Sequence, residues 1–129
     1  MKVNECKLEN PVFCKKEDGL VDVAKKLRDH KIRHIVVVDN MQPIGIVAAV
    51  DIVNQVIAEG KDYKHLKAAD VMVHPIFFID KNEEVSAAYF GMVKRSTYSC
   101  PVVEEGKFVG MLTFTEALSK LAKGKLGGA

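Results

Sequence analysis

The sequence has no tryptophan, and only three tyrosines and six phenylalanines stand among its 129 residues. A surface that stacks nucleic-acid bases on aromatic rings would therefore have little material. The sequence also lacks an excess of charge of either sign, because it has 19 basic and 17 acidic residues and a net charge of +2. So small a charge does not indicate a polyanionic partner, which disfavours nucleic acid as the main ligand.

Long hydrophobic runs are absent as well. The longest, residues 44–50, is far shorter than the roughly 20 residues of a membrane span. The N-terminus turns polar at Lys2 and does not resemble a signal peptide. The three cysteines, Cys6, Cys14 and Cys100, form no C-x-x-C pair, which suits a reducing compartment. We therefore expect a cytoplasmic protein without membrane contact, with its cysteines as small buried hydrophobes.

What the chain does contain is an internal repeat of about half its length. The match is one of residue type more than of identity. Residues 36–39 align with 101–104, residues 44–47 with 109–112, and residues 51–53 with 116–118, each pair 65 apart. This spacing predicts two copies of one structural unit.

Each copy is predicted to run strand, helix, strand, strand, helix, so the fold class is α/β (α+β). In the first copy the pattern predicts strands at 11–14, 32–38 and 44–48, a helix over 19–30 capped by Asp18, and a helix around 52–57. In the second copy it predicts strands at 76–79, 101–103 and 108–112. The two helices there have apolar faces at Val85, Ala88, Tyr89 and Met92, and at Ala117, Leu118, Leu121 and Ala122.

These elements predict how the chain is organised. The first repeat takes residues 1–60, a linker 61–66, the second repeat 67–123, and a flexible tail 124–129. A unit of about 60 residues buries only a marginal core by itself. We therefore expect the two copies to pack about a pseudo-twofold axis as one module.

The order of these motifs resembles a tandem pair of CBS domains, named after cystathionine β-synthase and also called a Bateman module. The first copy reads Ile-Arg-His-Ile-Val-Val-Val-Asp at 32–39 and Gly-Ile-Val-Ala-Ala-Val-Asp at 45–51. The second reads Thr-Tyr-Ser-Cys-Pro-Val-Val-Glu at 97–104 and Gly-Met-Leu-Thr-Phe-Thr-Glu at 110–116. Residues 69–72, Ala-Asp-Val-Met, resemble the segment that commonly precedes a CBS repeat.

The resemblance implies a regulatory module that binds AMP, ADP, ATP or S-adenosylmethionine in a cleft between the repeats and signals to a partner protein. No cofactor is required. In such modules the acid that opens the second helix accepts ribose hydroxyls, and the hydroxyl three residues earlier donates to a phosphate. A homodimer formed through the helices is also implied.

Carried over residue by residue, the pattern gives a set of ligand-binding candidates. The acids are Asp51 and Glu116, the latter standing where aspartate is usual, and the hydroxyl is Thr113. Ala48 takes the hydroxyl's place in the first copy, where basic residues before the valine strand would hold phosphate instead. The further candidates are Arg33, His34 and Tyr98 before the valine strands, and Val12, Ile32, Ile76 and Thr97 for backbone contact with a base.

Each candidate also has a plain structural interpretation. Asp51 and Glu116 suit the first turn of any helix because the helix dipole favours an acid there. Thr113 suits a helix cap, and Arg33 and His34 suit a solvated strand start. The alternative function is thus a non-catalytic structural or interaction module with degenerate sites.

Two further classes of function find little support in the chain. It has no Ser-His-Asp or Cys-His arrangement at family spacing and no phosphate-binding loop with a lysine, so we expect no enzyme. His30, His65 and His74 have no partner at metal-ligand spacing, so we expect no metal site.

Overall fold

The computed structural model describes residues 1–127. These residues form two compact units. The first-repeat unit takes residues Val12–Ile76. The second-repeat unit combines residues Met1–Pro11, hereafter the N-terminal arm, with the chain from Phe77 onward.

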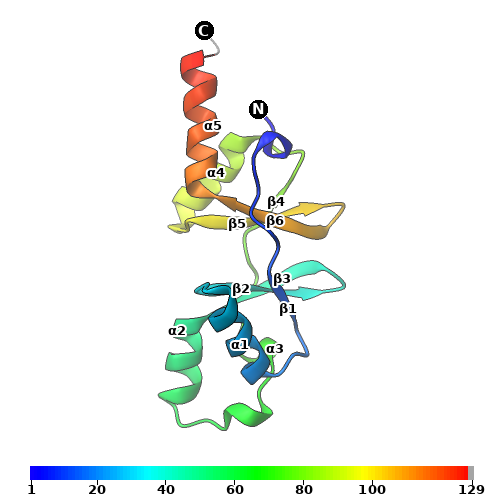
Figure 1. Cartoon of the computed structure of the whole chain (residues 1–129), viewed down its shortest axis with the longest axis vertical. Helices are drawn as coiled ribbons and strands as arrows, with labels where there is room; N and C mark the ends of the chain where they lie inside the picture. Colours follow the sequence, from blue (N-terminus) through cyan, green and yellow to red (C-terminus); the bar gives the residue numbers. More distant parts are fainter. Residues whose placement is uncertain (128–129) are drawn as a thin grey trace. The chain divides into compact units, whose positions relative to one another are not determined.

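The first-repeat unit is a three-stranded sheet with helices on one side (Figure 1). Strand β1 runs parallel to β2, and β2 runs antiparallel to β3. The elements are β1 (Phe13–Lys15), α1 (Leu20–His30), β2 (His34–Asp39), β3 (Gln42–Ala48), α2 (Ala49–Ile52), the π-helix η2 (Val53–Ile57), the 3₁₀ helix η3 (Tyr63–His65) and α3 (Ala68–Val71).

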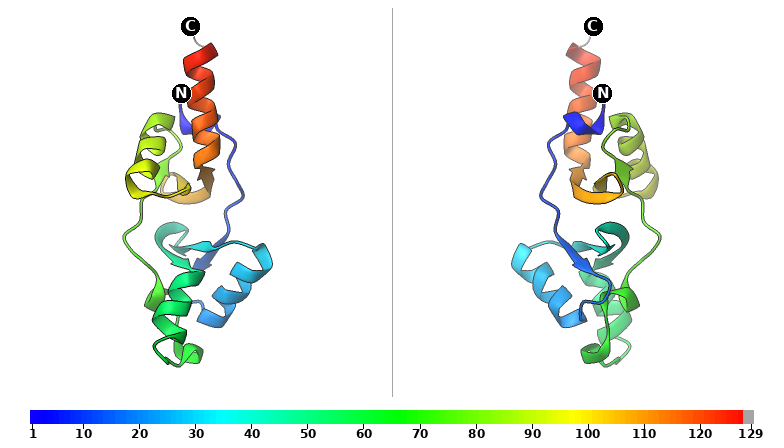
Figure 2. Two further views of the ribbon diagram at one scale, coloured as in Figure 1. Left: turned by 90° about the vertical axis from the view of Figure 1, so that its left-hand side faces the viewer. Right: turned by 90° about the vertical axis from the view of Figure 1, so that its right-hand side faces the viewer.

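The second-repeat unit has the same order of elements and the same sheet topology. Figure 2 shows its N-terminal 3₁₀ helix η1 on the same side of the sheet as α4 and α5. The elements are η1 (Val3–Glu5), β4 (Ile79–Asp80), α4 (Val85–Arg95), β5 (Ser99–Glu104), β6 (Lys107–Thr113) and α5 (Phe114–Gly127).

The predicted α+β class and the strand–helix–strand–strand–helix order are therefore confirmed in both units. The repeat is reproduced in the strand register. His34 pairs with Ala48 in one sheet, and Ser99 pairs with Thr113 in the other. Each hairpin also carries a register shift at the corresponding place, between Val37 and Val38 in β2 and between Val102 and Val103 in β5.

Each unit has its own apolar core between sheet and helices. Cys14 and Cys100 are buried in these cores as the sequence analysis expects, whereas Cys6 is half-buried. The first core contains Cys14, Leu20, Val23, Leu27, Ile35, Val37, Val47, Val56, Ala68 and Val71. The second contains Val3, Ile79, Val85, Ala88, Met92, Cys100, Val102, Leu112 and Ala117.

The face predicted around residues 52–57 is only partly correct. Ile52 and Val56 pack on the core, but Val53 and Ile57 are 54% and 58% exposed. Ile52 and Val56 lie four residues apart and share the face that meets the core, whereas Val53 and Ile57 lie about 100° further round the helix axis. The segment also contains a π-helical turn, in which the N–H of Ala58 donates to the carbonyl of Val53 at 2.8 Å.

Several other sequence predictions need correction. Asp18 does not cap α1, because its carboxylate accepts the N–H of Lys15 at 2.9 Å and Gly19 is the N-cap residue. The strand predicted over 76–79 begins only at Ile79, since Phe77 packs instead over Gly91 of α4. On α5, Leu118 is 44% exposed while Ala117 is buried. The predicted tail 124–129 starts inside α5, and residues 128 and 129 lie outside the described part of the chain.

The two hairpin turns generate a prediction about stability. Asn40 and Met41 have φ of 49° and 63°, and Glu105 and Gly106 have φ of 52° and 78°. This left-handed pair is the turn that favours Asn-Gly, and a side chain at its second position is strained. We expect Met41→Gly to raise the free energy of unfolding by about 0.5–1 kcal/mol in urea titrations.

The matched control is Gly106→Met in the other hairpin, which places a side chain at the same turn position. We expect it to lower the free energy of unfolding by a similar amount. A loss of stability in Met41→Gly would mean that the packing of the Met41 side chain outweighs the backbone strain.

Candidate ligand-binding site

In each unit the Gly-x-x-x-x-x-acid segment joins the last strand of the sheet to the following helix. In the second-repeat unit Thr113 ends β6 and Glu116 lies in the first turn of α5. In the first-repeat unit Ala48 ends β3 and Asp51 lies in the first turn of α2. The last residues of the motif therefore lie at a helix N-terminus, where the helix dipole favours negative charge.

The Thr113 hydroxyl caps α5. Its Oγ1 accepts the backbone N–H of Glu116 at 3.1 Å and so satisfies one of the free donors at the helix N-terminus. The plain interpretation of Thr113 as a cap is thus correct. The oxygen keeps a second acceptor site and its own proton for a ligand.

The Glu116 carboxylate points toward the N-terminal arm. Its Oε2 accepts the backbone N–H of Lys7 at 2.7 Å, a contact between residues 109 positions apart. Both groups belong to the second-repeat unit. An acid that the repeat pattern places at a helix start therefore also anchors the beginning of the chain.

A hollow of about 670 Å³ lies between the arm and the start of α5. That volume is within the range of small-molecule sites. Thr113 and Glu116 are the two predicted site residues that it brings together. Its lining is Lys7, Leu8, Glu9, Asn10, Thr113, Thr115, Glu116 and Ser119.

Asp51 has a different set of partners from Glu116. Its Oδ2 accepts the N–H of Ala48 at 3.1 Å, so the carboxylate folds back on its own helix start. The backbone of Arg33 and His34 lies next to the start of α2, because the Arg33 carbonyl accepts the N–H of Ala49 at 2.9 Å and His34 pairs with Ala48. Both residues are exposed. The first-repeat unit thus gathers two exposed basic side chains and one acid around the start of α2.

Thr97 and Tyr98 occupy the corresponding place in the second-repeat unit but do not line the hollow. The Tyr98 carbonyl accepts the N–H of Phe114 at 2.7 Å, and its ring is 83% exposed. The Thr97 N–H donates to the carbonyl of Met92 at the end of α4. Their role in ligand binding remains a prediction.

The remaining candidates are apolar. Val12 and Ile32 are half-buried and pack against the first core, and Ile76 is half-buried at the end of the first-repeat unit. Such positions are typical of core or strand-edge residues. Contact of their backbone with a base remains a prediction.

The motif glycines make room for the protein's own chain. A Cβ at Gly110 would lie 2.9 Å from the carbonyl oxygen of Glu9 and 2.9 Å from Cβ of Leu8. A Cβ at Gly45 would lie 2.5 Å from Sδ of Met72. At both positions the space that a side chain would fill is thus occupied by a segment of the same unit that crosses over the glycine.

Sequence reasoning missed the arm, which contributes half of the hollow's lining, and the neighbouring hydroxyls of Thr115 and Ser119. A signal was present in the repeat. Lys2 and Glu5 stand 65 residues before Lys67 and Asp70, and in both pairs the lysine N–H donates to the acid, at 2.7 and 2.8 Å. The segment before each repeat is therefore itself repeated.

The thiols are kept protonated by their surroundings. Burial raises the pKa of Cys14 to about 11 and that of Cys100 to about 12. Burial also raises the pKa of Cys6, next to the hollow, with the Glu116 carboxylate adding to the effect. Within residues 1–127, no group of three or more His, Cys, Asp or Glu side chains is placed to hold a metal ion.

The cap on α5 generates a prediction. Thr113→Val keeps the shape of the side chain and removes the oxygen that accepts the Glu116 N–H. We expect the free energy of unfolding to fall by about 1 kcal/mol in urea titrations. Thr113→Ser keeps the oxygen and is the control. Equal losses in the two variants would contradict a capping role.

Two copies of one α+β unit, each with an acid at the helix start after its last strand, define a tandem-repeat class of protein. The family model described as CBS domain matches residues 3–58 and 68–123. The chain belongs to the CBS domain family.

One relative is the uncharacterized protein MK0525 of Methanopyrus kandleri, which is 33% identical over 100 residues. That match covers 76% of this chain and 51% of the relative, so the chain spans about half of the relative's length.

Two solved structures show the same fold at low identity. Hypoxic Response Protein I, solved with two coordinated zinc ions, has a TM-score of 0.80 at 20% identity, covering 93% of this chain and 98% of that one. CBSX2, solved in complex with AMP, has a TM-score of 0.73 at 18% identity, covering 96% and 98%. No helix in the described part of this chain has the length and apolar character that crossing a membrane requires.

Proposed function

We propose that this chain is a regulatory module that binds an adenosine-containing ligand, with AMP, ADP, ATP and S-adenosylmethionine as candidates. The observation that carries the proposal is the hollow beside Thr113 and Glu116. It combines a carboxylate, hydroxyl groups and a helix N-terminus, which suit a ribose and a phosphate. The binding of AMP by CBSX2, a protein of the same fold, supports this choice of ligand.

The chemistry of the hollow supports a nucleotide in three ways. The Glu116 carboxylate accepts hydrogen bonds from paired hydroxyls. The Thr113 hydroxyl and the N-terminal end of α5, where negative charge is favoured, suit a phosphate. Lys7 adds a positive charge to the same wall.

We propose a second site at the start of α2. There Asp51 would accept the ribose, while Arg33 and His34 would replace the hydroxyl that Ala48 lacks. The full set of proposed ligand contacts is Val12, Ile32, Arg33, His34, Asp51, Ile76, Thr97, Tyr98, Thr113 and Glu116. The output is proposed to pass to a partner protein, without a catalytic step in this chain and in the cytoplasm.

The alternative is a structural or interaction module with degenerate sites. Two observations favour it. Glu116 and Asp51 both already accept backbone N–H groups, and Ala48 leaves the first copy without its hydroxyl. A carboxylate has about four acceptor positions, so one backbone partner does not exhaust either acid.

A thermal-shift titration with AMP separates the two functions. Ligand at about 100 times Kd should stabilise the chain by ~2.7 kcal/mol. We expect Glu116→Gln and Asp51→Asn each to weaken AMP binding about tenfold in calorimetry, because each loses a charge-assisted hydrogen bond. Glu105→Gln, in an exposed turn, is the control. The absence of a shift with AMP, ADP, ATP and S-adenosylmethionine would favour the structural module.

We also propose that the chain forms a homodimer through its helices. The supporting observation is apolar exposure in the second-repeat unit, where Phe90 and Val93 of α4 and Leu118 of α5 are 65%, 49% and 44% exposed. Burial of such side chains stabilises an interface at roughly 25 cal/mol per Å². Phe90→Glu should lower the dimer fraction in sedimentation velocity, whereas Val21→Glu on α1 should not. A wild-type monomer at high concentration would contradict the proposal.

A further inference from the structure

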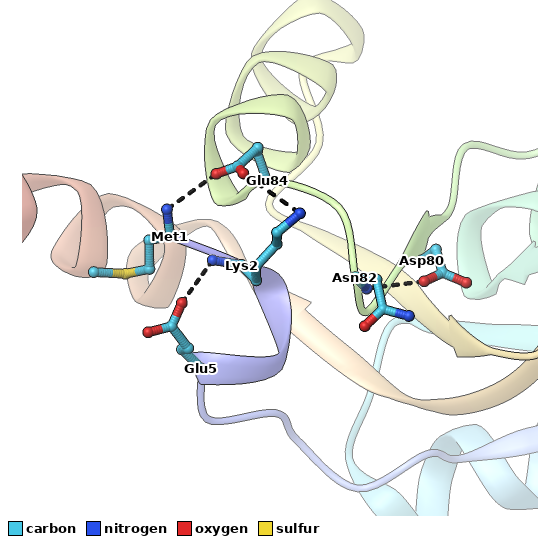
Figure 3. Close-up of polar contacts among 6 residues, drawn as sticks. All are labelled: Met1, Lys2, Glu5, Asp80, Asn82 and Glu84. Atoms are coloured by element: carbon cyan, nitrogen blue, oxygen red, sulfur yellow. Dashed lines mark hydrogen bonds and ion pairs between the residues drawn. The ribbon is translucent and has the colours of Figure 1, made fainter.

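The N-terminal arm is attached to its unit at several places along its length, and Figure 3 shows the contacts of Met1 and Lys2 with Glu84 at its start. At its start, Nζ of Lys2 lies 3.6 Å from the Glu84 carboxylate. Val3 is fully buried in the second core, and its N–H donates to the carbonyl of Glu83 at 2.9 Å. Glu9 exchanges two backbone hydrogen bonds with Met111, at 2.9 and 3.0 Å, along the outer edge of β6.

Between these two attachments, the contact with Glu116 holds the arm. The Lys7 N–H donates to the carboxylate at 2.7 Å, which is the short distance expected of a charge-assisted hydrogen bond. Such bonds contribute more than neutral ones. Glu116 thus links the arm to the helix that carries the ligand motif.

The hollow depends on the arm being docked. Lys7, Leu8, Glu9 and Asn10 make up half of the residues that line it, and α5 with the end of β6 supplies the rest. A ligand that touches both walls binds the docked arm better than the released one. By linkage, occupancy of the hollow and docking of the arm must then stabilise each other.

The first-repeat unit lacks this arrangement. There Val73 pairs with Ile46 much as Glu9 pairs with Met111, so the crossing segment is present. The Asp51 carboxylate, one methylene shorter than that of Glu116, accepts the N–H of Ala48 in its own helix start. Asp51 therefore provides a matched control for Glu116.

We propose that Glu116 is a latch for the N-terminal arm and that docking of the arm is the regulated step at this site. With the latch closed, the arm forms one wall of the hollow. With the latch open, the arm loses its link to α5 and this wall of the hollow loosens, while Val3 still holds the start of the arm in the second core. The coupling to a ligand rests on the proposed function, whereas the latch itself does not.

The latch is tested without ligand by hydrogen exchange of the full chain. We expect Glu116→Ala to speed exchange of the Lys7 and Glu9 amides about tenfold or more, the effect of losing one charge-assisted hydrogen bond. The amides of β5 should stay protected. Asp51→Ala should leave the Lys7 and Glu9 amides unchanged. Equal protection of the arm in Glu116→Ala and in the unaltered chain would overturn the latch.

The coupling is tested with AMP and a variant that does not touch the ligand groups. In Gly110→Ala the new Cβ would press on the Glu9 carbonyl and push the arm away. We expect AMP binding to weaken about tenfold, although Gly110 does not line the hollow. Gly45→Ala, which presses on the Met72 side chain in the first-repeat unit, is the control for the arm, because it should leave the protection of the Lys7 and Glu9 amides unchanged.

The outcomes separate the latch from the proposed function. Extra protection of the Lys7 and Glu9 amides when AMP is added supports the coupling. AMP that binds the unaltered chain without protecting these amides overturns it. An unaltered chain that binds no AMP contradicts the proposed function, and the ligand-free exchange of Glu116→Ala then still supports or overturns the latch.

Discussion

Each unit is built around one close crossing of two chain segments, at Gly45 in the first-repeat unit and at Gly110 in the second. At Gly110 the arm pairs with β6 through Glu9, and at Gly45 the chain pairs with β3 through Val73. A side chain at either glycine would meet the crossing segment at less than the distance that real contacts allow. These crossings bring Val3 into the second core and α3 into the first. Each unit is therefore completed by residues that precede the other repeat in the sequence.

The same motif has diverged between the two units through small chemical changes. Thr113 supplies a cap that Ala48 cannot supply, and Glu116 reaches the arm where Asp51 returns to its own helix. The two motifs thus differ by the hydroxyl of Thr113 and by one methylene in the acid. The second-repeat motif contacts the arm and lines the hollow, whereas the acid of the first-repeat motif bonds only to its own helix start. The two halves of a CBS pair that look alike in sequence pattern therefore present different chemistry to a ligand.

The valine strands, the strands that pair with them in the hairpins and the first helix of each repeat could be predicted because burial imposes a simple period on them. Val85, Ala88 and Met92 are buried as that period requires. The helix after β3 was predicted less well, because Val53 and Ile57 lie beside the buried face of Ile52 and Val56 and stay exposed. Asp18 was predicted to cap α1, but in the turn before the helix its carboxylate accepts the N–H of Lys15 instead. Of the candidate site, Thr113 and Glu116 were found from the motif, whereas Lys7 and Asn10 were not.

The repeat, the α+β class, the order of elements and the positions of the two acids are predictable from the amino-acid sequence, because these properties follow from local residue type and spacing. The packing of the N-terminal arm with the second repeat and the hydrogen bond from the Lys7 N–H to Glu116 became known from the folded chain alone. This hydrogen bond joins residues 109 positions apart. No local pattern predicts such a contact. It depends on how the arm packs on the edge strand, and it uses backbone groups that are the same in almost every residue.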